Sequence, residues 1–173
     1  MKTLITLIVM VCGTHLAFAE NKAEEAEFWY KKGLAAEKVG DPATAIAAYK
    51  AALELNSKHA NARYRMGEVK NNAAGLKADA REAKIGSVKI PTYQIENLTV
   101  QEALDVLTVA IEKQSNKEIT PNFVIEDPGK KLADVKVTLN LKNVPVSGIL
   151  GYIHAQSNTK IRYDEHAVVI LAR

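Results

Sequence analysis

The sequence holds 173 residues, of which 47% are hydrophobic and 25% charged, and its formal net charge is +3. This length suits one domain or two small ones, and the apolar content argues against wholesale disorder. The small net charge lacks the basic excess of nucleic-acid-binding proteins, and a lone cysteine excludes a disulfide framework and a multi-cysteine zinc site. Composition therefore excludes several classes of protein without indicating a reaction.

Residues 1–19 have the pattern of a secretory signal peptide. Lys2 is followed by a run from Leu4 to Cys12 that is apolar except for Thr6, and Ala17-Phe18-Ala19 gives the small-x-small pattern that a signal peptidase cleaves. The run is shorter than the roughly 20 apolar residues that span a membrane. Cleavage after Ala19 leaves no cysteine and 22 basic against 20 acidic side chains. We expect a periplasmic protein with no transmembrane segment in the mature chain, associated with the outer membrane only through partners.

Residues 20–85 are predicted to be helical. Alanine, lysine and glutamate dominate this region, and no alternating run of β-branched residues interrupts it. Gly40-Asp41-Pro42 marks a break, because glycine ends helices in the left-handed conformation and proline suits the first turn of the next helix. The pattern predicts a helical hairpin, with a further helix that begins near Ala60.

The spacing of small and aromatic residues in this hairpin resembles a tetratricopeptide repeat, and Ala26 to His59 has the length of one repeat. The residues that carry the resemblance are Trp29, Gly33, Gly40, Ala45, Tyr49 and Ala52. The pattern restarts at Ala60, with Met66-Gly67 in the place of Lys32-Gly33, and fades after Asn72. One repeat does not bury its apolar faces alone. The helical region is therefore expected to pack on the second domain, on a partner or on another copy of the chain.

The resemblance implies a protein-binding groove lined by the first helix of each repeat. Carried over by position, the groove residues are Tyr30, Leu34, Lys38, Tyr64 and Glu68. The two tyrosines would hold an extended peptide of the partner. In an alternative interpretation, Tyr30 and Tyr64 pack against the second domain.

Residues 86–173 change to a mixed pattern that predicts an α+β domain. Thr99 and Glu102 form a capping box before an apolar helical stripe, and residues 135–142 alternate as in a strand with one buried face. The predicted order is strand 88–95, helix 100–115, strands 122–126 and 135–142, a helix from 145, and strands 160–163 and 167–171. We expect a βαββαββ domain, a small sheet with both helices on one face.

The segment from Val137 to Val146, followed by Ile149-Leu150, resembles the STN domain found in secretins and at the N-terminus of TonB-dependent receptors. Ile161 to Tyr163 and Ala167 to Ile170 look like the final hairpin of that domain. The resemblance implies a periplasmic, non-enzymatic module that docks on partner proteins or on copies of itself. An open sheet edge of this domain is a second predicted docking site.

Residue types that carry chemistry do not gather into a recognisable motif. Metal-ligand spacing is absent among the three histidines His59, His154 and His166. We therefore expect no metal, no cofactor and no catalytic residue. The small net charge leads us to expect no nucleic-acid partner. The expected function is that of an exported adaptor that docks protein partners in the bacterial envelope, within a secretion, pilus or TonB-type transport assembly. Secretin or TonB components are the expected partners. The alternative is a periplasmic ligand-sensing module that binds a small molecule or a cell-wall fragment.

Overall fold

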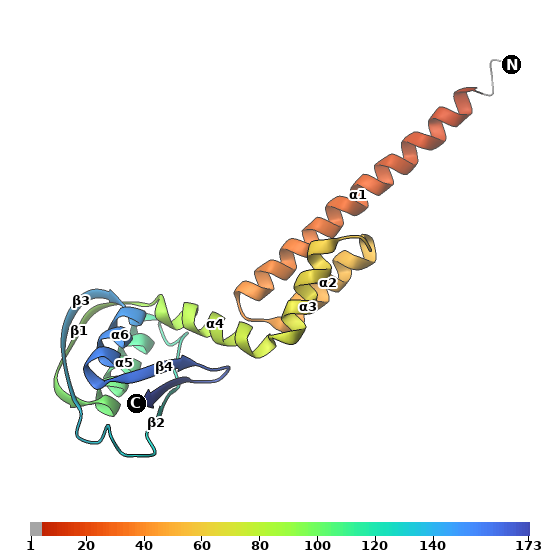
Figure 1. Ribbon diagram of the computed structural model, residues 1–173. Coiled ribbons are helices and arrows are strands. Elements are labelled where there is room, and N and C mark those ends of the chain that lie inside the picture. Colours follow the sequence, from red (N-terminus) through yellow and green to blue (C-terminus); the bar gives the residue numbers. More distant parts are fainter. Residues whose placement is uncertain (1–4) are drawn as a thin grey trace. The chain divides into compact units, whose positions relative to one another are not determined.

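The computed structural model describes the backbone of residues 5–173 and the side chains of residues 21–173. The predicted signal peptide therefore lies outside the described side chains. The chain divides into two compact units, Met1–Leu76 and Lys77–Arg173 (Figure 1). The division after Leu76 assigns most of the fourth helix, residues 73–86, to the second unit. The sequence placed the boundary after this helix, between residues 85 and 86. Among the described residues, no helix is both long and apolar enough to cross a membrane.

The first unit contains the predicted hairpin and one further helix. These helices are α1 (Ile5–Lys38), α2 (Pro42–Leu55) and α3 (Ala60–Asn71). The predicted break between α1 and α2 is confirmed: Gly40 adopts a φ of 72°, and the Asp41 carboxylate accepts a hydrogen bond from the Thr44 amide at 3.0 Å. Pro42 then opens α2. These three residues reverse the chain, because each suits a different position of a helix–helix turn.

Small residues and one aromatic side chain form the core of the first unit. The buried members are Ala36, Ala45, Tyr49, Ala52, Ala62 and Val69. Alanines on facing helices let the backbones approach closely, and the ring of Tyr49 fills the space that remains. Glycine is required at position 33 because a Cβ there would overlap the ring of Tyr49.

A further break, at Asn72, ends α3 at the residue after which the repeat pattern of the sequence fades. Only this residue separates α3 from α4 (Ala73–Gly86), and its backbone angles are φ −131° and ψ 38°. The Asn72 amide still donates to the carbonyl of Glu68 at 3.0 Å. The junction has neither the length nor the left-handed glycine of the turn at Gly40, so it does not repeat the geometry of the first hairpin.

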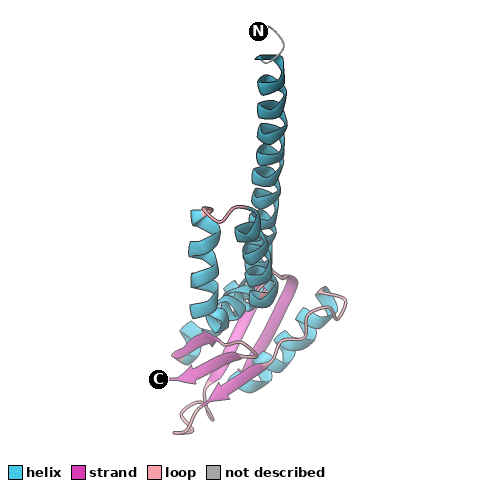
Figure 2. Cartoon of the chain, turned by 90° about the vertical axis from the view of Figure 1, so that its right-hand side faces the viewer, coloured by secondary structure: helices cyan, strands magenta, loops and turns pink. Residues whose placement is uncertain are grey.

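The second unit holds all the strands of the described chain (Figure 2). The predicted order of strands and helices is confirmed. The elements are β1 (Lys89–Thr99), α5 (Val100–Gln114), β2 (Phe123–Glu126), β3 (Lys136–Pro145), α6 (Val146–Ser157), β4 (Thr159–Tyr163) and β5 (Val168–Ala172). The capping box is present, since Thr99 accepts from the Glu102 amide and Glu102 accepts from the Thr99 amide.

The strands form two sheets, which corrects the predicted single sheet. β1 and β3 pair as an antiparallel ribbon, while β2, β5 and β4 form a three-stranded sheet in which β2 and β5 are parallel. Both helices contact the β1–β3 ribbon, and α6 also contacts β4. The consecutive strands β2 and β3 belong to different sheets, and residues 127–135 connect them. This segment begins with Asp127, whose carboxylate accepts from the amides of Lys131 and Leu132.

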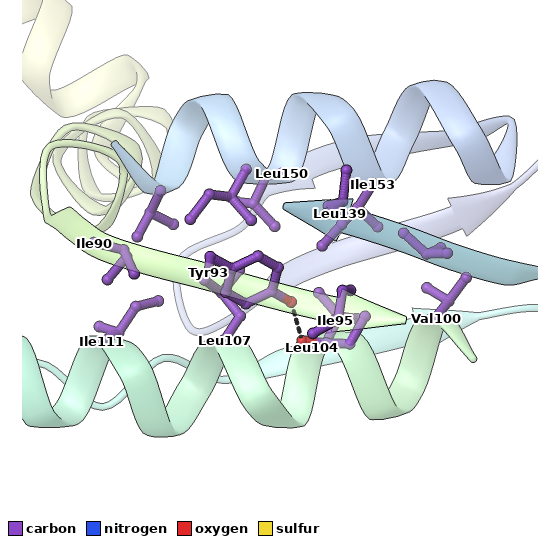
Figure 3. Packing of buried hydrophobic residues seen from close by; sticks show 14 of the residues in the cluster. Ile90, Tyr93, Ile95, Val100, Leu104, Leu107, Ile111, Leu139, Leu150 and Ile153 are labelled. Carbon is purple, nitrogen blue, oxygen red and sulfur yellow. Dashed lines mark hydrogen bonds between the residues drawn. The ribbon is translucent and has the colours of Figure 1, made fainter. Parts of the chain in front are cut away.

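One hydrophobic core joins both sheets with α5 and α6 of the second unit, and Ile85 of α4 contributes to it (Figure 3). Tyr93 lies at its centre, and its hydroxyl donates a hydrogen bond to the carbonyl of Ala103 at 2.6 Å. Burial raises the pKa of the Tyr93 phenol above its ordinary value, because the charged phenolate has no water around it.

The helix α4 is tied to the turn between β4 and β5 within this unit. Lys77 Nζ lies 2.5 Å from Glu165 Oε1, and Arg81 Nη2 donates to the backbone carbonyl of Glu165 at 2.7 Å. The hydrogen bond from Lys77, together with its positive charge, lowers the pKa of the Glu165 carboxyl. Lys77 and Arg81 are one helical turn apart, so both reach the same turn from one face of α4.

Candidate interaction surface

The five predicted groove residues are divided between α1 and α3. Tyr30 and Leu34 of α1 are half-buried, whereas Lys38 of α1 and Tyr64 and Glu68 of α3 are exposed. An ion pair joins the two helices, since Arg65 Nη1 of α3 lies 3.3 Å from Glu37 Oε2 of α1. The structure thus places the five residues on neighbouring helices but leaves only three of them open to a ligand.

Tyr30 belongs to an aromatic cluster inside the first unit. Its ring centroid lies 4.8 Å from that of His59 and 5.8 Å from that of Tyr49. His59 is fixed in turn, since its Nδ1 accepts from the Ala62 amide at the start of α3 and its Nε2 lies 3.3 Å from Glu27 Oε2. Tyr30 therefore supports the junction of α1 with α3 and offers only part of its ring to a partner.

A second polar cluster, which sequence reasoning missed, also joins the helices. The Tyr49 hydroxyl donates to Glu37 Oε1, and Arg65 Nη1 lies 3.3 Å from Glu37 Oε2. The Glu37 side chain is only 13% exposed, so its charge needs both partners. Burial and the neighbouring Glu37 carboxylate raise the pKa of the Tyr49 phenol. Glu37 and Arg65 are 28 residues apart in sequence, and no local pattern points to their pairing.

The residues left for recognition are an aromatic ring and two opposite charges. Tyr64 is 66% exposed, and no ion pair of Lys38 or Glu68 is found among the described side chains. An exposed tyrosine offers a flat apolar face with a hydroxyl at its edge, and exposed charges on the same unit can orient a bound chain. The arrangement is suited to an extended polypeptide segment.

Another aromatic group on α1 combines Trp29, a residue of the repeat pattern, with Phe28, which the sequence did not single out. The rings of Phe28 and Trp29 meet edge to face, with centroids 5.8 Å apart, and Lys32 Nζ lies 4.9 Å and 4.7 Å from the two centroids. Phe28 is 53% exposed. The contact of a lysine with both rings covers part of their apolar surface.

The two glycines at equivalent positions of the repeat pattern differ in their surroundings, and opposite effects of alanine are expected. Gly33→Ala would force a methyl group into the ring of Tyr49, so we expect a loss of roughly 1–3 kcal/mol of unfolding free energy. A Cβ at Gly67 meets nothing within 4 Å, so Gly67→Ala is expected to gain about 0.5–1 kcal/mol through helix propensity. Urea unfolding followed by circular dichroism measures both. Destabilisation by Gly67→Ala would show that an atom occupies the space beside Gly67.

The histidines show no sign of metal binding in the part of the chain with described side chains. No three His, Cys, Asp or Glu side chains there form a group that could hold a metal ion. His59 caps a helix, and His166 lies on the surface with its Nε2 3.4 Å from Glu165 Oε1. His154 is half-buried on α6, and its Nδ1 has no hydrogen-bond partner.

Comparison with known proteins supports the first of the two resemblances. The family model of the tetratricopeptide repeat matches residues 26–59, the segment that begins and ends as the sequence predicted. No curated protein and no solved structure matches the chain. Tetratricopeptide repeats are protein-interaction elements, so the first unit indicates a role in protein–protein interaction.

Proposed function

We propose that this protein is a non-enzymatic adaptor whose first unit holds an extended segment of a partner protein between α1 and α3. The observation that carries the proposal is the exposure of Tyr64, which is 66% accessible and lies on α3, the helix that begins just after the matched repeat. Glu68 lies one helical turn after Tyr64 on α3, and Lys38 is the last residue of α1. The partner segment is therefore expected to present an apolar side chain to Tyr64 and charged groups to its neighbours.

The proposed location is the bacterial envelope, in a secretion, pilus or TonB-type assembly. The signal-peptide pattern of residues 1–19 supports export, and the order of strands and helices in the second unit agrees with the resemblance to an STN domain. If residues 1–19 are cleaved, mass spectrometry of the exported chain will find Glu20 at its N-terminus. An intact Met1 on protein from the periplasmic fraction would contradict the proposed cleavage.

The groove is tested by site-specific photo-crosslinking in envelope extracts. A photoreactive phenylalanine analogue at position 64 is expected to capture a discrete partner. The same analogue at Lys50, an exposed position of α2 with 73% of its side chain accessible, is expected to capture none. Equal capture from both positions would contradict the proposed groove.

Purified partner then allows a matched pair of variants. Tyr64→Ala is expected to weaken binding about tenfold, because interface tyrosines often contribute more than 1 kcal/mol. Tyr152→Ala removes another exposed tyrosine, 51% accessible and located in the second unit, and is expected to leave the affinity unchanged. Both variants should unfold at the temperature of the unmodified protein. Loss of binding in Tyr152→Ala alone would transfer the site to the second unit.

A further inference from the structure

A cleft of about 360 Å³ lies within the second unit, between α4, α6 and β4. Asp79 and Glu82 line it from α4, Leu150 and Gly151 from α6, and Ile161 from β4. Its size is at the lower end of the range of about 300–1,000 Å³ that is typical of ligand sites. The cleft is therefore large enough for one long side chain of a partner, and it is independent of the groove proposed on the first unit.

The floor of the cleft is apolar and open. Leu150 and Ile161 line the cleft; Leu150 is 1% exposed and supports the floor, and the half-buried Ile161 contributes most of its open aliphatic surface. Gly151 leaves the entrance free, because a Cβ added there would meet nothing within 4 Å. Packing does not require a glycine at this position, in contrast to Gly148, where a Cβ would lie 2.9 Å from a methyl group of Val144. The absence of a side chain at Gly151 instead contributes to the volume of the cleft.

The rim of the cleft carries negative charge that no neighbouring cation neutralises. Among the described side chains, neither Asp79 nor Glu82 takes part in an ion pair. The nearby basic side chains are engaged elsewhere, Lys77 and Arg81 with Glu165. Arg162 on β4 pairs with acidic residues outside the cleft. The cleft therefore combines an aliphatic floor with two free carboxylates.

Two residues with hydroxyl groups also line the cleft. They are Ser147, in the first turn of α6, and Tyr163, on β4. Burial and the Glu82 carboxylate raise the pKa of the Tyr163 phenol, so Tyr163 lies within the electrostatic influence of Glu82. Both hydroxyl oxygens accept hydrogen bonds as well as donating them.

We infer that this cleft binds an arginine side chain of a partner protein. The aliphatic stem of the arginine would lie on Leu150 and Ile161, and its guanidinium would face Asp79 and Glu82. Arginine suits the site better than lysine, because its five N–H donors match two carboxylates and two hydroxyl oxygens, whereas an ammonium has only three. A guanidinium is also less strongly hydrated, so it enters a half-apolar cleft more readily.

The two carboxylates have an alternative role that leads to a different prediction. The N-terminus of α6, at Val146, carries partial positive charge, and acidic groups near such an end stabilise the helix. If Asp79 and Glu82 served only this role, their removal would lower the thermal stability of the second unit. It would not alter the affinity for an arginine side chain.

The experiment uses the full chain and the probe N-acetyl-arginine N-methylamide, with binding followed by amide chemical shifts. Its uncharged isostere, N-acetyl-citrulline N-methylamide, is the matched control. We expect shifts gathered around residues 78–82, 147–151 and 161–163, and roughly tenfold weaker binding of citrulline, because the charge-assisted hydrogen bonds are lost. Equal affinities for the two probes, or shifts scattered over both units, would overturn the inference.

Variants locate the site. Asp79→Asn with Glu82→Gln is expected to weaken arginine binding about tenfold, while Glu118→Gln with Asp134→Asn removes two exposed carboxylates elsewhere in the unit and should change nothing. Gly151→Leu fills the entrance and should abolish binding without lowering the unfolding temperature. An unchanged affinity in the first variant or in Gly151→Leu would contradict the site. None of these residues belongs to the groove on α1 and α3. A negative result for the arginine cleft therefore leaves the proposed groove untouched, and a negative result for the groove leaves the cleft untouched.

Discussion

Replacing Tyr49 with alanine is expected to lower the unfolding free energy of the first unit by about 3–5 kcal/mol, the range for deleting a buried aromatic ring. Tyr49 is fully buried, its ring covers Gly33, and its hydroxyl donates to Glu37. The substitution therefore leaves a cavity between α1 and α2 and removes one of the two partners of a shielded carboxylate. Since a small domain has only about 5–15 kcal/mol in total, most of the helical signal of this unit should be lost on moderate heating.

Two further variants separate the ring from its hydroxyl. Tyr49→Phe keeps the packing on Gly33 and removes only the hydrogen bond to Glu37, so a loss of about 1–2 kcal/mol is expected. Tyr64→Ala removes an exposed ring of the same type and should leave stability nearly unchanged. Urea unfolding followed by circular dichroism ranks the three. If Tyr49→Ala unfolded at the same urea concentration as Tyr64→Ala, the core of the hairpin described above would be wrong.

Replacing Tyr93 with alanine is expected to have a similar effect on the second unit, about 3–5 kcal/mol. The ring of Tyr93 lies between α5, α6 and the β1–β3 ribbon, and its hydroxyl satisfies the Ala103 carbonyl. The loss should appear as collapse of the amide spectrum of the strands. A native spectrum for Tyr93→Ala would contradict the central position of this ring.

Tyr93→Phe isolates the hydroxyl and gives a test by pH. The folded pKa is raised above the ordinary value of 10.0, so above that pH the unfolded chain releases a proton that the folded chain retains. Stability from this group is fully present below pH 10 and is lost as the pH rises. We expect the unfolding free energy of Tyr93→Phe to fall less steeply above pH 10 than that of the unmodified protein, by up to about 1.4 kcal/mol per pH unit. Parallel curves would contradict the predicted shift.

Local patterns predicted the elements of this fold because their causes are local. The capping box at Thr99 and Glu102 involves residues three apart, and the burial of Val137 and Leu139 follows from the alternation of a single strand. The turn at Gly40 likewise needs only its own three residues. Each of these features was placed from the sequence within a few residues of its observed position.

What the sequence did not predict depends on contacts between distant segments. The partition of the strands into two sheets is decided by pairing Phe123 with Val168, which no local pattern encodes. β1 continues past Ile95 because Asn97 takes a left-handed conformation at an irregularity in the pairing with β3, an option that asparagine accepts more easily than most residues.

The predicted groove residues are less accessible than their positions in the repeat suggested, and the groove itself stays a prediction. Position in the repeat placed Tyr30 and Tyr64 on α1 and α3, as observed. The repeat pattern did not reveal that His59 and Tyr49 would pack on Tyr30. His59 precedes α3 and Tyr49 lies on α2, so both contact the ring of Tyr30 only after the helices have packed together. The arginine cleft was missed entirely, since its carboxylates, floor and hydroxyls come from three separate elements.

The place of β5 in the three-stranded sheet has a consequence for the order of folding during synthesis. β5 is the middle strand, paired with β2 on one side and β4 on the other, yet it is the last of the strands along the chain. A ribosome releases the N-terminal segments first. The hairpin of α1 and α2 can therefore form as soon as both helices have emerged, whereas β2 remains unpaired until β5 has been synthesised. Until β5 emerges, β2 and β4 each present unpaired amides and carbonyls, and a chaperone that shields exposed strand edges would be needed most during that interval.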